Sequence, residues 1–208
     1  LSRWARPQME IDGVTREGPR RAAISSFGGG GSYAHVVLEE YRDMGKSDCQ
    51  VADSTQIAVL SAKNETSLRK YARKLSDFLK ANRKNPDLTM LNTAYTLQLG
   101  RVPMEERLAM VVPDIDLLIS KLADFLQGQP SDGLYRGKVS EQMLQTMEFF
   151  NGPEASEFLK ITIESRKLEK VAYLCVNAIE PDWSLFYKNC LPKRISLPTY
   201  AFEKKRFW

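Results

Sequence analysis

Over the middle of the chain, the spacing of hydrophobic and polar residues alternates between a pattern typical of strands and one typical of helices. Residues 56–61 form a short apolar run that is typical of a strand. After it, apolar side chains recur at steps of three and four residues, which places them on one face of a helix. They are Leu68, Tyr71, Leu75, Phe78 and Leu79. Asn64 or Ser61 can cap this helix, and Asn85-Pro86 is expected to end it.

The alternation of strand and helix patterns continues to about residue 137. We expect a helix over 87–99, a strand over 107–112, a helix over 115–127 and a short strand over 134–137. Gly100 and Gly128 follow the two helices, and glycine commonly ends a helix. Elements that alternate in this order predict an α/β (α+β) fold, in which helices pack on a small three-stranded sheet.

The first forty residues follow another pattern. Two apolar runs, 22–27 and 34–38, flank four consecutive glycines at 28–31. Because glycine adopts backbone angles closed to other residues, the pattern predicts a hairpin with a glycine-rich turn. We expect the first run to be a buried strand and the hairpin to need a larger sheet, because nothing before it is long enough to supply one.

Residues 20–40 also carry a family resemblance. They read RRAAISSFGGGGSYAHVVLEE, which resembles the end of a polyketide synthase ketosynthase domain, where the pattern is close to R-R-A-G-I-S-S-F-G-x-G-G-S/T-N-A-H-V-x-L-E-E. The hairpin is then expected to be a remnant of a thiolase-like ketosynthase. Tyr33 stands where the family usually has Asn, and Gly29 where many relatives have Ala or Phe. The resemblance implies a set of residues that line the acyl channel of the intact domain. They are Phe27, Gly28, Gly29 and Gly30.

Further stretches extend the resemblance. Residues 61–63 and 94–101 resemble the flanking subdomain, or ketosynthase-to-acyltransferase linker, and residues 197–208 resemble the post-acyltransferase linker, with Ala201 in place of its second Pro. An acyltransferase between these linkers would need some hundreds of residues and a G-H-S-x-G motif. Residues 140–188 provide only two or three helical segments. The order therefore resembles a trans-acyltransferase polyketide synthase.

The resemblance and the composition shifts together predict five segments. They are the end of a ketosynthase (1–42), a linker (43–55), the flanking subdomain (56–138), a helical insert (139–190) and an extended C-terminal strap (191–208). Apolar side chains of the strap are expected to pack in grooves of the flanking subdomain and the ketosynthase. Those side chains are Leu197, Pro198, Tyr200, Phe202 and Trp208.

The helical insert is rich in methionine and phenylalanine. Its candidate interaction residues are Met143, Met147, Phe149 and Phe150. Apolar faces of this kind either contact neighbouring copies of the synthase or complete the local core. The sequence leaves both interpretations open.

The chemistry of a ketosynthase needs a cysteine nucleophile and two histidines. The chain has one histidine, His35, so we expect no catalytic residue in this segment and a hydrogen-bonded core role for His35. Cys49, Cys175 and Cys190 are widely spaced and form no CxxC pair, which argues against a disulfide framework and against a zinc or other metal site. We expect Cys175 and Cys190 to be buried, unreactive thiols.

Charge and composition change this picture little. The formal net charge is +4 and 43% of the residues are hydrophobic, as in an ordinary globular protein. The helix expected after residue 64 has a basic face, which is more often a solubilising surface than a site. Its charged residues are Arg69, Lys70, Arg73, Lys74, Asp77 and Lys80. We expect no nucleic-acid site, no membrane span of ~20 apolar residues, and a cytoplasmic setting.

The resemblance implies a non-catalytic structural and docking region of a modular polyketide synthase. Such a synthase extends acyl chains on acyl carrier proteins that bear phosphopantetheine, whereas this segment is expected to bind no cofactor itself. The implied partners are the rest of the ketosynthase, acyl carrier proteins, a trans-acting acyltransferase and, through self-association, neighbouring synthases. The alternative is that the chain is part of an intact ketosynthase that catalyses decarboxylative Claisen condensation.

Overall fold

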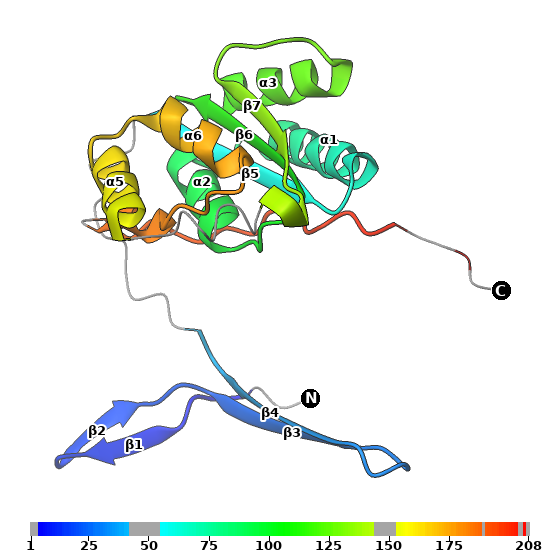
Figure 1. Ribbon diagram of the computed structural model, residues 1–208. Coiled ribbons are helices and arrows are strands. Elements are labelled where there is room, and N and C mark those ends of the chain that lie inside the picture. The colour runs from blue at the N-terminus through cyan, green and yellow to red at the C-terminus, as the bar shows by residue number, and fades with distance from the viewer. Residues whose placement is uncertain (1–3, 42–54, 144–152, 189, 204–205, 207–208) are drawn as a thin grey trace. The chain divides into compact units, whose positions relative to one another are not determined.

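The computed structural model describes residues 4–41, 55–143, 153–188, 190–203 and 206. It divides the chain into two units, Leu1–Gly45 and Lys46–Trp208, which are described separately (Figure 1). The division falls inside the linker predicted at 43–55.

The N-terminal unit begins with a hairpin that the sequence pattern had not predicted. Strands β1 (Gln8–Ile11) and β2 (Val14–Glu17) pair in antiparallel fashion. Asp12 and Gly13 form the turn between them, with φ of 53° and 72°. Positive φ at both central positions is what a type I′ turn requires, and Asp-Gly is a strong signal for it. This hairpin is a sheet of its own and pairs with neither β3 nor β4, so the expectation that nothing before residue 22 supplies a sheet for the glycine-turn hairpin to join agrees with the structure.

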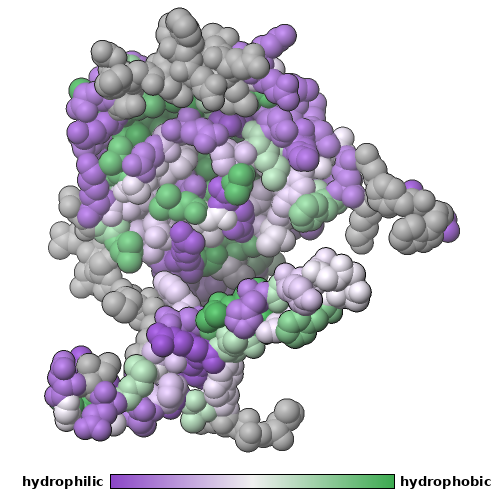
Figure 2. Space-filling view, turned by 60° about the horizontal axis from the view of Figure 1, so that its bottom comes forward, coloured by the Kyte–Doolittle hydropathy of each residue, from purple (hydrophilic) through white to green (hydrophobic). Residues whose placement is uncertain are grey.

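The predicted glycine-turn hairpin is confirmed. Strand β3 (Arg21–Phe27) pairs antiparallel with β4 (Tyr33–Glu39), in a register that runs from Arg21 opposite Glu39 to Phe27 opposite Tyr33. Both strands are exposed along nearly their whole length, and Figure 2 shows hydrophobic side chains on the surface of this hairpin. Among the described residues of the unit, β3 and β4 form a sheet of two strands without further cover, so the larger sheet that the hairpin was expected to need is not supplied here and burial of the strand stays a prediction.

The C-terminal unit is built on the predicted three-stranded sheet. The strand order is β5 (Gln56–Ala62), β6 (Glu106–Val112), β7 (Leu134–Lys138), and both pairs are antiparallel. The predicted α/β fold is thus confirmed.

The helices of the flanking subdomain begin at capping side chains. They are α1 (Glu65–Ala81), α2 (Met90–Leu99) and α3 (Ile115–Gln127). Asn64, Thr89 and Asp114 each accept the backbone N–H three residues further on, which satisfies a donor left open at a helix start. The cap at Thr89 explains why the second helix begins at Met90 and not at residue 87. Gly128, with φ of 73°, ends α3 where the glycine signal predicted.

Side chains of the sheet alternate between two cores. Leu60, Leu108 and Met110 face the core shared with α1 and α3. Ala109 and Val111 face the opposite side, which is covered by α5 (Pro153–Glu164) and α6 (Leu168–Val176), and the 3₁₀ turn η1 (Trp183–Tyr187) follows them (Figure 1). Covered on both faces, all seven residues of β6 are buried.

The segment predicted as a helical insert therefore contributes to the local core. Ile163 of α5 and Val171 and Ala172 of α6 are buried against the sheet. This is one of the two interpretations that the sequence left open for the segment. Within the ranges that the structure describes, none of the helices is long and apolar enough to cross a bilayer.

Candidate functional site

The C-terminal strap (residues 191–208) is held against α2 by side chains of that helix. The backbone N–H of Lys193 donates to Asn92 Oδ1 at 2.9 Å, and that of Ile195 donates to Thr96 Oγ1 at 3.1 Å. Asn92 and Thr96 are four residues apart, so they share one face of α2. Residues 193 and 195 are two apart, the repeat at which an extended chain presents equivalent groups. Side chains of α2 thus accept the backbone N–H groups of the strap that a neighbouring strand would accept in a sheet.

Arg101 fixes the next part of the strap. Its Nη2 donates to the carbonyl oxygens of Leu197 and Pro198, both at 3.4 Å. Its Nε donates to the hydroxyl of Tyr71 in α1 at 3.2 Å, and its Nη1 donates to Gly100 O at 2.8 Å. One guanidinium therefore joins α1, the end of α2 and the strap.

The strap also packs into the core, but not with every side chain that was expected to do so. Leu197 and Ala201 are buried with the side chains of α1 and α3, and Pro198 and Tyr200 are half-buried. Tyr200 OH accepts a hydrogen bond from Lys63 N at 3.3 Å. Phe202 is 79% exposed and meets the Tyr200 ring edge-on at 4.8 Å between centroids.

Phe202 does not pack in a groove of this unit, and its packing against the ketosynthase stays a prediction. Ala201 points into the core, and neighbouring residues of an extended chain point to opposite sides. Trp208, the last residue expected to pack, lies outside the described residues.

A buried hydrogen-bond chain links η1 to the edge of the sheet. Tyr187 OH donates to Gln98 Oε1 at 2.6 Å, and Gln98 Nε2 donates to Ile57 O at 2.7 Å. The rings of Tyr187 and Tyr95 meet edge-on at 4.9 Å. Burial raises the pKa of Tyr187, so its hydroxyl stays protonated and serves as the donor. Through Gln98, α2 covers the outer edge of β5.

A pocket of about 310 Å³ lies where β5, the end of α2 and the strap meet, and its lining includes Val102, Trp183 and Tyr200. The polar groups around it are bonded within the protein: Ser61 Oγ accepts the N–H of Met104 at 3.1 Å. The Arg107 guanidinium donates to the carbonyl oxygens of Met104 and Cys175 and to Glu180. Among the described residues that line the pocket, the surface is mainly apolar, and the free thiol of Cys175 has a pKa raised by burial to about 11.

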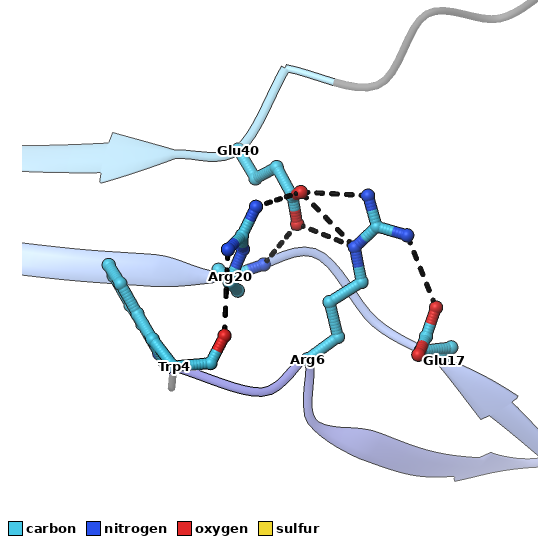
Figure 3. Close-up of polar contacts among 5 residues, drawn as sticks. All are labelled: Trp4, Arg6, Glu17, Arg20 and Glu40. Carbon is cyan, nitrogen blue, oxygen red and sulfur yellow. Dashed lines mark hydrogen bonds and ion pairs between the residues drawn. The ribbon is translucent and has the colours of Figure 1, made fainter. Parts of the chain in front are cut away.

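The N-terminal unit has a polar cluster centred on Glu40 (Figure 3). Arg6 approaches its carboxylate with two nitrogens, at 2.9 and 2.8 Å, and Arg20 Nη2 donates to it at 2.6 Å. Arg6 also contacts Glu17 at 3.3 Å, and Arg20 contacts the carbonyl oxygen of Trp4 at 3.5 Å. Hydrogen bonds from the two guanidinium groups, that of Arg6 first, hold the pKa of Glu40 well below its usual range.

This cluster ties the segment before β1 to the ends of β2, β3 and β4. Near neutral pH, neither an ionised guanidinium nor a carboxylate of strongly lowered pKa exchanges protons, so the cluster is not suited to acid–base catalysis. Its role is structural, because two cations hold one carboxylate.

Comparison with known proteins assigns one segment of the chain to a family. Residues 59–129 match the family model described as "RhiE-like, KS-MAT linker domain". That segment belongs to the RhiE-like KS-MAT linker family. The whole chain is similar to bacterial polyketide synthases: it is 37% identical over 191 residues to PksL and 36% identical over 208 residues to PksM, both of Bacillus subtilis strain 168. These matches cover 91% and 100% of the chain but only 4% and 5% of the two synthases.

Solved ketosynthase structures agree with this assignment. The ketosynthase from module 6 of the bacillaene synthase of Bacillus subtilis 168 aligns with a TM-score of 0.67 and 36% identity, over 92% of the chain and 32% of that structure. Ketosynthase twelve of the bacillaene synthase of Bacillus amyloliquefaciens aligns with a TM-score of 0.58 and 36% identity, over 93% and 30%. The chain thus spans about a third of these ketosynthase structures.

The glycine turn lies outside the segment that matches the KS-MAT linker model, and it is closed by its own backbone. Gly28 N donates to Ser32 O at 2.8 Å, and Gly31, with φ of 85°, donates to Gly28 O at 3.1 Å. Phe27 is 75% exposed, and its ring meets that of Tyr33 edge-on at 5.7 Å. Tyr33, in place of the usual Asn, therefore makes a ring contact here. The channel-lining role of Phe27, Gly28, Gly29 and Gly30 stays a prediction.

The predictions for His35, Cys175 and Cys190 agree with the structure only in part. His35 Nδ1 lies 2.9 Å from Ser25 Oγ, so the predicted hydrogen bond is present, but the residue is exposed and its predicted core position is wrong for this chain. Burial raises the pKa of the Cys175 thiol to about 11, which fits the predicted unreactive thiol. Cys190 is disulfide-bonded, so the prediction of a free thiol was wrong for it. Among the described residues, no group of three His, Cys, Asp or Glu side chains could hold a metal ion.

The predicted interaction surface of the insert is described at one residue. Met143 is half-buried, and its N–H donates to Ser140 Oγ at 3.2 Å. Met147, Phe149 and Phe150 lie outside the described residues.

The strap-holding residues Asn92, Thr96 and Arg101 were not predicted. Thr96 and Arg101 lie in the stretch 94–101 that carried the resemblance, so a signal was present. It gave no partner, because the strap lies about a hundred residues further along the chain.

Proposed function

We propose that this chain is a non-catalytic structural and docking region of a modular polyketide synthase of the trans-acyltransferase type. It continues from the ketosynthase, supports it, and spaces it from the domain that follows. The observation that carries the proposal is the strap. Residues 191–203 return to α2 and enter the same core as the flanking subdomain, and the residues between β7 and the strap supply α5, α6 and η1.

That arrangement bears on the acyltransferase. The two linker segments that would otherwise enclose an acyltransferase share one core through Leu197, Ala201 and the Arg101 contacts. The helices between them pack on the second face of the sheet and leave no length of sequence for a further catalytic domain. In the proposed synthase the acyltransferase therefore acts as a separate protein.

The exposed hairpin supports the link to a ketosynthase. Ile24, Val36, Val37 and Leu38 are about half or more exposed although they lie in paired strands. In the proposed assembly the rest of the ketosynthase covers them, and Phe27 and Gly28–Gly30 border its acyl channel. Burial of such side chains is worth about 1.5–3 kcal/mol each, which is ample to hold the hairpin in place.

The partners follow from the family. Acyl carrier proteins with phosphopantetheine deliver the chains, a trans-acting acyltransferase loads them, and neighbouring synthases associate through Met143, Met147, Phe149 and Phe150. The region itself binds no cofactor, and its setting is the cytoplasm.

Removing the contacts that hold the strap tests the proposed supporting role. In the complete ketosynthase polypeptide that contains this chain, Arg101→Ala removes the contacts to Tyr71, Leu197 and Pro198. We expect faster limited proteolysis after Lys193 and Arg194 and a lower condensation rate, because the strap detaches. Peptide mass spectrometry measures the first effect, and product formation on the carrier protein measures the second.

A matched control keeps that test specific. Arg83 forms an exposed ion pair with Asp116 away from the strap, so Arg83→Ala should change neither readout. If Arg101→Ala leaves both cleavage and condensation as they are in the parent, the proposed support through the strap is refuted.

A second candidate is that the chain works as part of the catalytic ketosynthase itself, and the structural match to ketosynthases favours it. Intact-mass measurement after incubation with an acyl thioester separates the two candidates. We expect the complete ketosynthase polypeptide to gain the acyl group and this chain alone to gain none. An acyl adduct on the isolated chain would contradict the non-catalytic assignment.

A further inference from the structure

The pocket beside the strap combines apolar walls with a small group of hydrogen-bond donors. Its volume is about 310 Å³, and its lining includes the apolar side chains of Val102 and Trp183 and the polar ones of Tyr71, Arg101 and Tyr200. We call it the strap pocket. Binding sites for small molecules are built in this way, with mostly apolar walls and a few polar groups that fix the orientation of the ligand.

Arg101 is a half-buried cation that has no anionic partner among the described residues. Its nitrogens donate only to neutral oxygens: the hydroxyl of Tyr71 and the carbonyls of Gly100, Leu197 and Pro198. The last two bonds, at 3.4 Å, are longer than the roughly 2.7–3.2 Å that is usual for N–H···O bonds. A charge withdrawn from water is costly unless it is paired, so this guanidinium favours an anion beside it.

The second arginine of the lining shows what a paired charge looks like here. Arg107 is buried, and its Nη2 donates to Glu180 at 3.0 Å. Among the described residues that line the pocket, Glu180 is the only acid, so its charge is already balanced. The lining therefore keeps one uncompensated positive charge, and that charge is on Arg101.

Two phenolic hydroxyls of the lining also have a hydrogen to donate. Tyr71 is 3% exposed, and its hydroxyl accepts from Arg101 Nε at 3.2 Å. The hydroxyl of Tyr200 accepts from Lys63 N at 3.3 Å. A hydroxyl donates one hydrogen besides accepting, and neither tyrosine donates to an acceptor in the part of the chain that the structure describes. Both hydrogens are therefore available to an acceptor in the pocket.

These donors select the chemistry of the ligand. A carboxylate carries one negative charge, which matches Arg101, and its two oxygens accept hydrogen bonds from a guanidinium and from hydroxyls. A phosphomonoester has a charge of about −1.5 to −2 near neutral pH, which a single half-buried guanidinium does not balance. The apolar walls suit a hydrocarbon body, and the volume is at the lower end of the roughly 300–1,000 Å³ of ligand pockets. The ligand is therefore compact.

We propose that the strap pocket binds a small carboxylic acid with an apolar body, whose carboxylate is held by Arg101 and by the hydroxyls of Tyr71 and Tyr200. The inference goes beyond the proposed function, in which this pocket has no part. An acyl chain released by hydrolysis belongs to this class of ligand. Bound there, it contacts α1, the end of α2 and the strap, which are the parts that Arg101 joins.

Photolabelling of the complete ketosynthase polypeptide that contains this chain tests the site. The probe is octanoic acid with a diazirine on its chain, and mass spectrometry of the labelled peptides separates this pocket from any site elsewhere in the polypeptide. We expect label in the peptides that contain residues 102–104 and 181–183. Unlabelled octanoate should suppress it at about tenfold lower concentration than 1-octanol, because the alcohol lacks the charge that Arg101 binds.

Val102 offers a variant that leaves the hydrogen bonds of the strap in place. It lines the pocket, follows Arg101 in the chain and is 76% exposed. Val102→Asp adds a carboxylate at the pocket, so octanoate should compete about tenfold less well, while competition by 1-octanol should change less than about twofold. Ile161→Asp makes the same charge change at a residue of α5 that is 53% exposed and outside the lining, and should alter neither competition. Circular dichroism melting checks that both variants are folded.

Three results would overturn the proposal. They are the absence of label from the two peptides, equal competition by octanoate and 1-octanol in the parent, and equal weakening of octanoate by Val102→Asp and Ile161→Asp, which would mean attraction to the overall charge only. The outcome is separable from that of the proposed function. Cleavage after Lys193 and Arg194 and the condensation rate do not enter this test, so the strap experiment stands in either case.

Discussion

Strands β4 and β6 have similar apolar content and opposite fates. All seven residues of β6 are buried between two layers of helices, whereas all seven residues of β4 are exposed. Both strands are fully paired in antiparallel ladders. The difference lies in what covers them: β6 has cover on both faces within its unit, and β4 has a single partner strand among the described residues. An apolar strand sequence therefore indicates that the strand has to be packed against something, but it does not tell which part of the protein packs on it.

The two units are also held together by different forces. The C-terminal unit has two hydrophobic cores that share one sheet, and a third, smaller apolar cluster between α2 and η1. The N-terminal unit depends on its ladders and on the partly exposed surface cluster of Arg6, Arg20 and Glu40. Exposed ion pairs contribute little to stability, and isolated hairpins are marginal in water. We infer that the C-terminal unit is the more stable of the two in this chain.

A substitution in the core should show the largest difference in stability between the two units. Leu75 is fully buried on the inward face of α1, so Leu75→Ala leaves a cavity and should lower the free energy of unfolding by about 2–5 kcal/mol. Val37 of β4 is 66% exposed, so Val37→Ala should change it by less than about 0.5 kcal/mol. Urea unfolding of the chain, followed by circular dichroism, measures both. Equal losses from the two substitutions would mean that the hairpin is covered in solution.

A smaller effect should appear in the acid titration of the N-terminal unit. The folded-state pKa of Glu40 is lowered, so the cluster stabilises the fold above the unfolded value of about 4.3, and this contribution is lost as the pH falls through the folded-state pKa. Carboxyl carbon NMR should show Glu40 titrating below the usual range. Arg6→Ala with Arg20→Ala should move the midpoint back towards about 4.3.

The neighbouring ion pair provides the control for that titration. Arg21 contacts Glu39 at 2.5 Å and does not contact Glu40, so Arg21→Ala should leave the Glu40 midpoint where it is. A parent protein in which Glu40 titrates at its ordinary pKa would show that the cluster does not persist in solution.

The strap shows the limit of prediction from sequence. Leu197 was expected in a groove and is buried, because a large apolar side chain is more stable packed in the protein interior than exposed to water. Phe202 was expected to pack and is exposed, since the pointing direction of each strap residue depends on which neighbour enters the core. The hydrogen bonds from Asn92, Thr96 and Arg101 were not predicted at all, because a polar residue on a helix does not reveal its distant partner.

Local interactions allowed the sequence alone to determine most of the C-terminal unit. Helix spacing, the cap at Asn64 and the glycine at 128 act within a few residues, so β5, α1 and α3 could be predicted with nearly their observed bounds. The missed β1–β2 hairpin had a local signal of the same kind in Asp12-Gly13.

Tertiary structure alone decided what depends on residues far apart in the chain. It placed α5 and α6 on the second face of the sheet, seated the strap on α2, and brought Arg101 and Arg107 to their hydrogen-bond partners. The physical reason is that burial and pairing are properties of a neighbourhood in space. A sequence states which groups need neighbours, and only the folded chain supplies them.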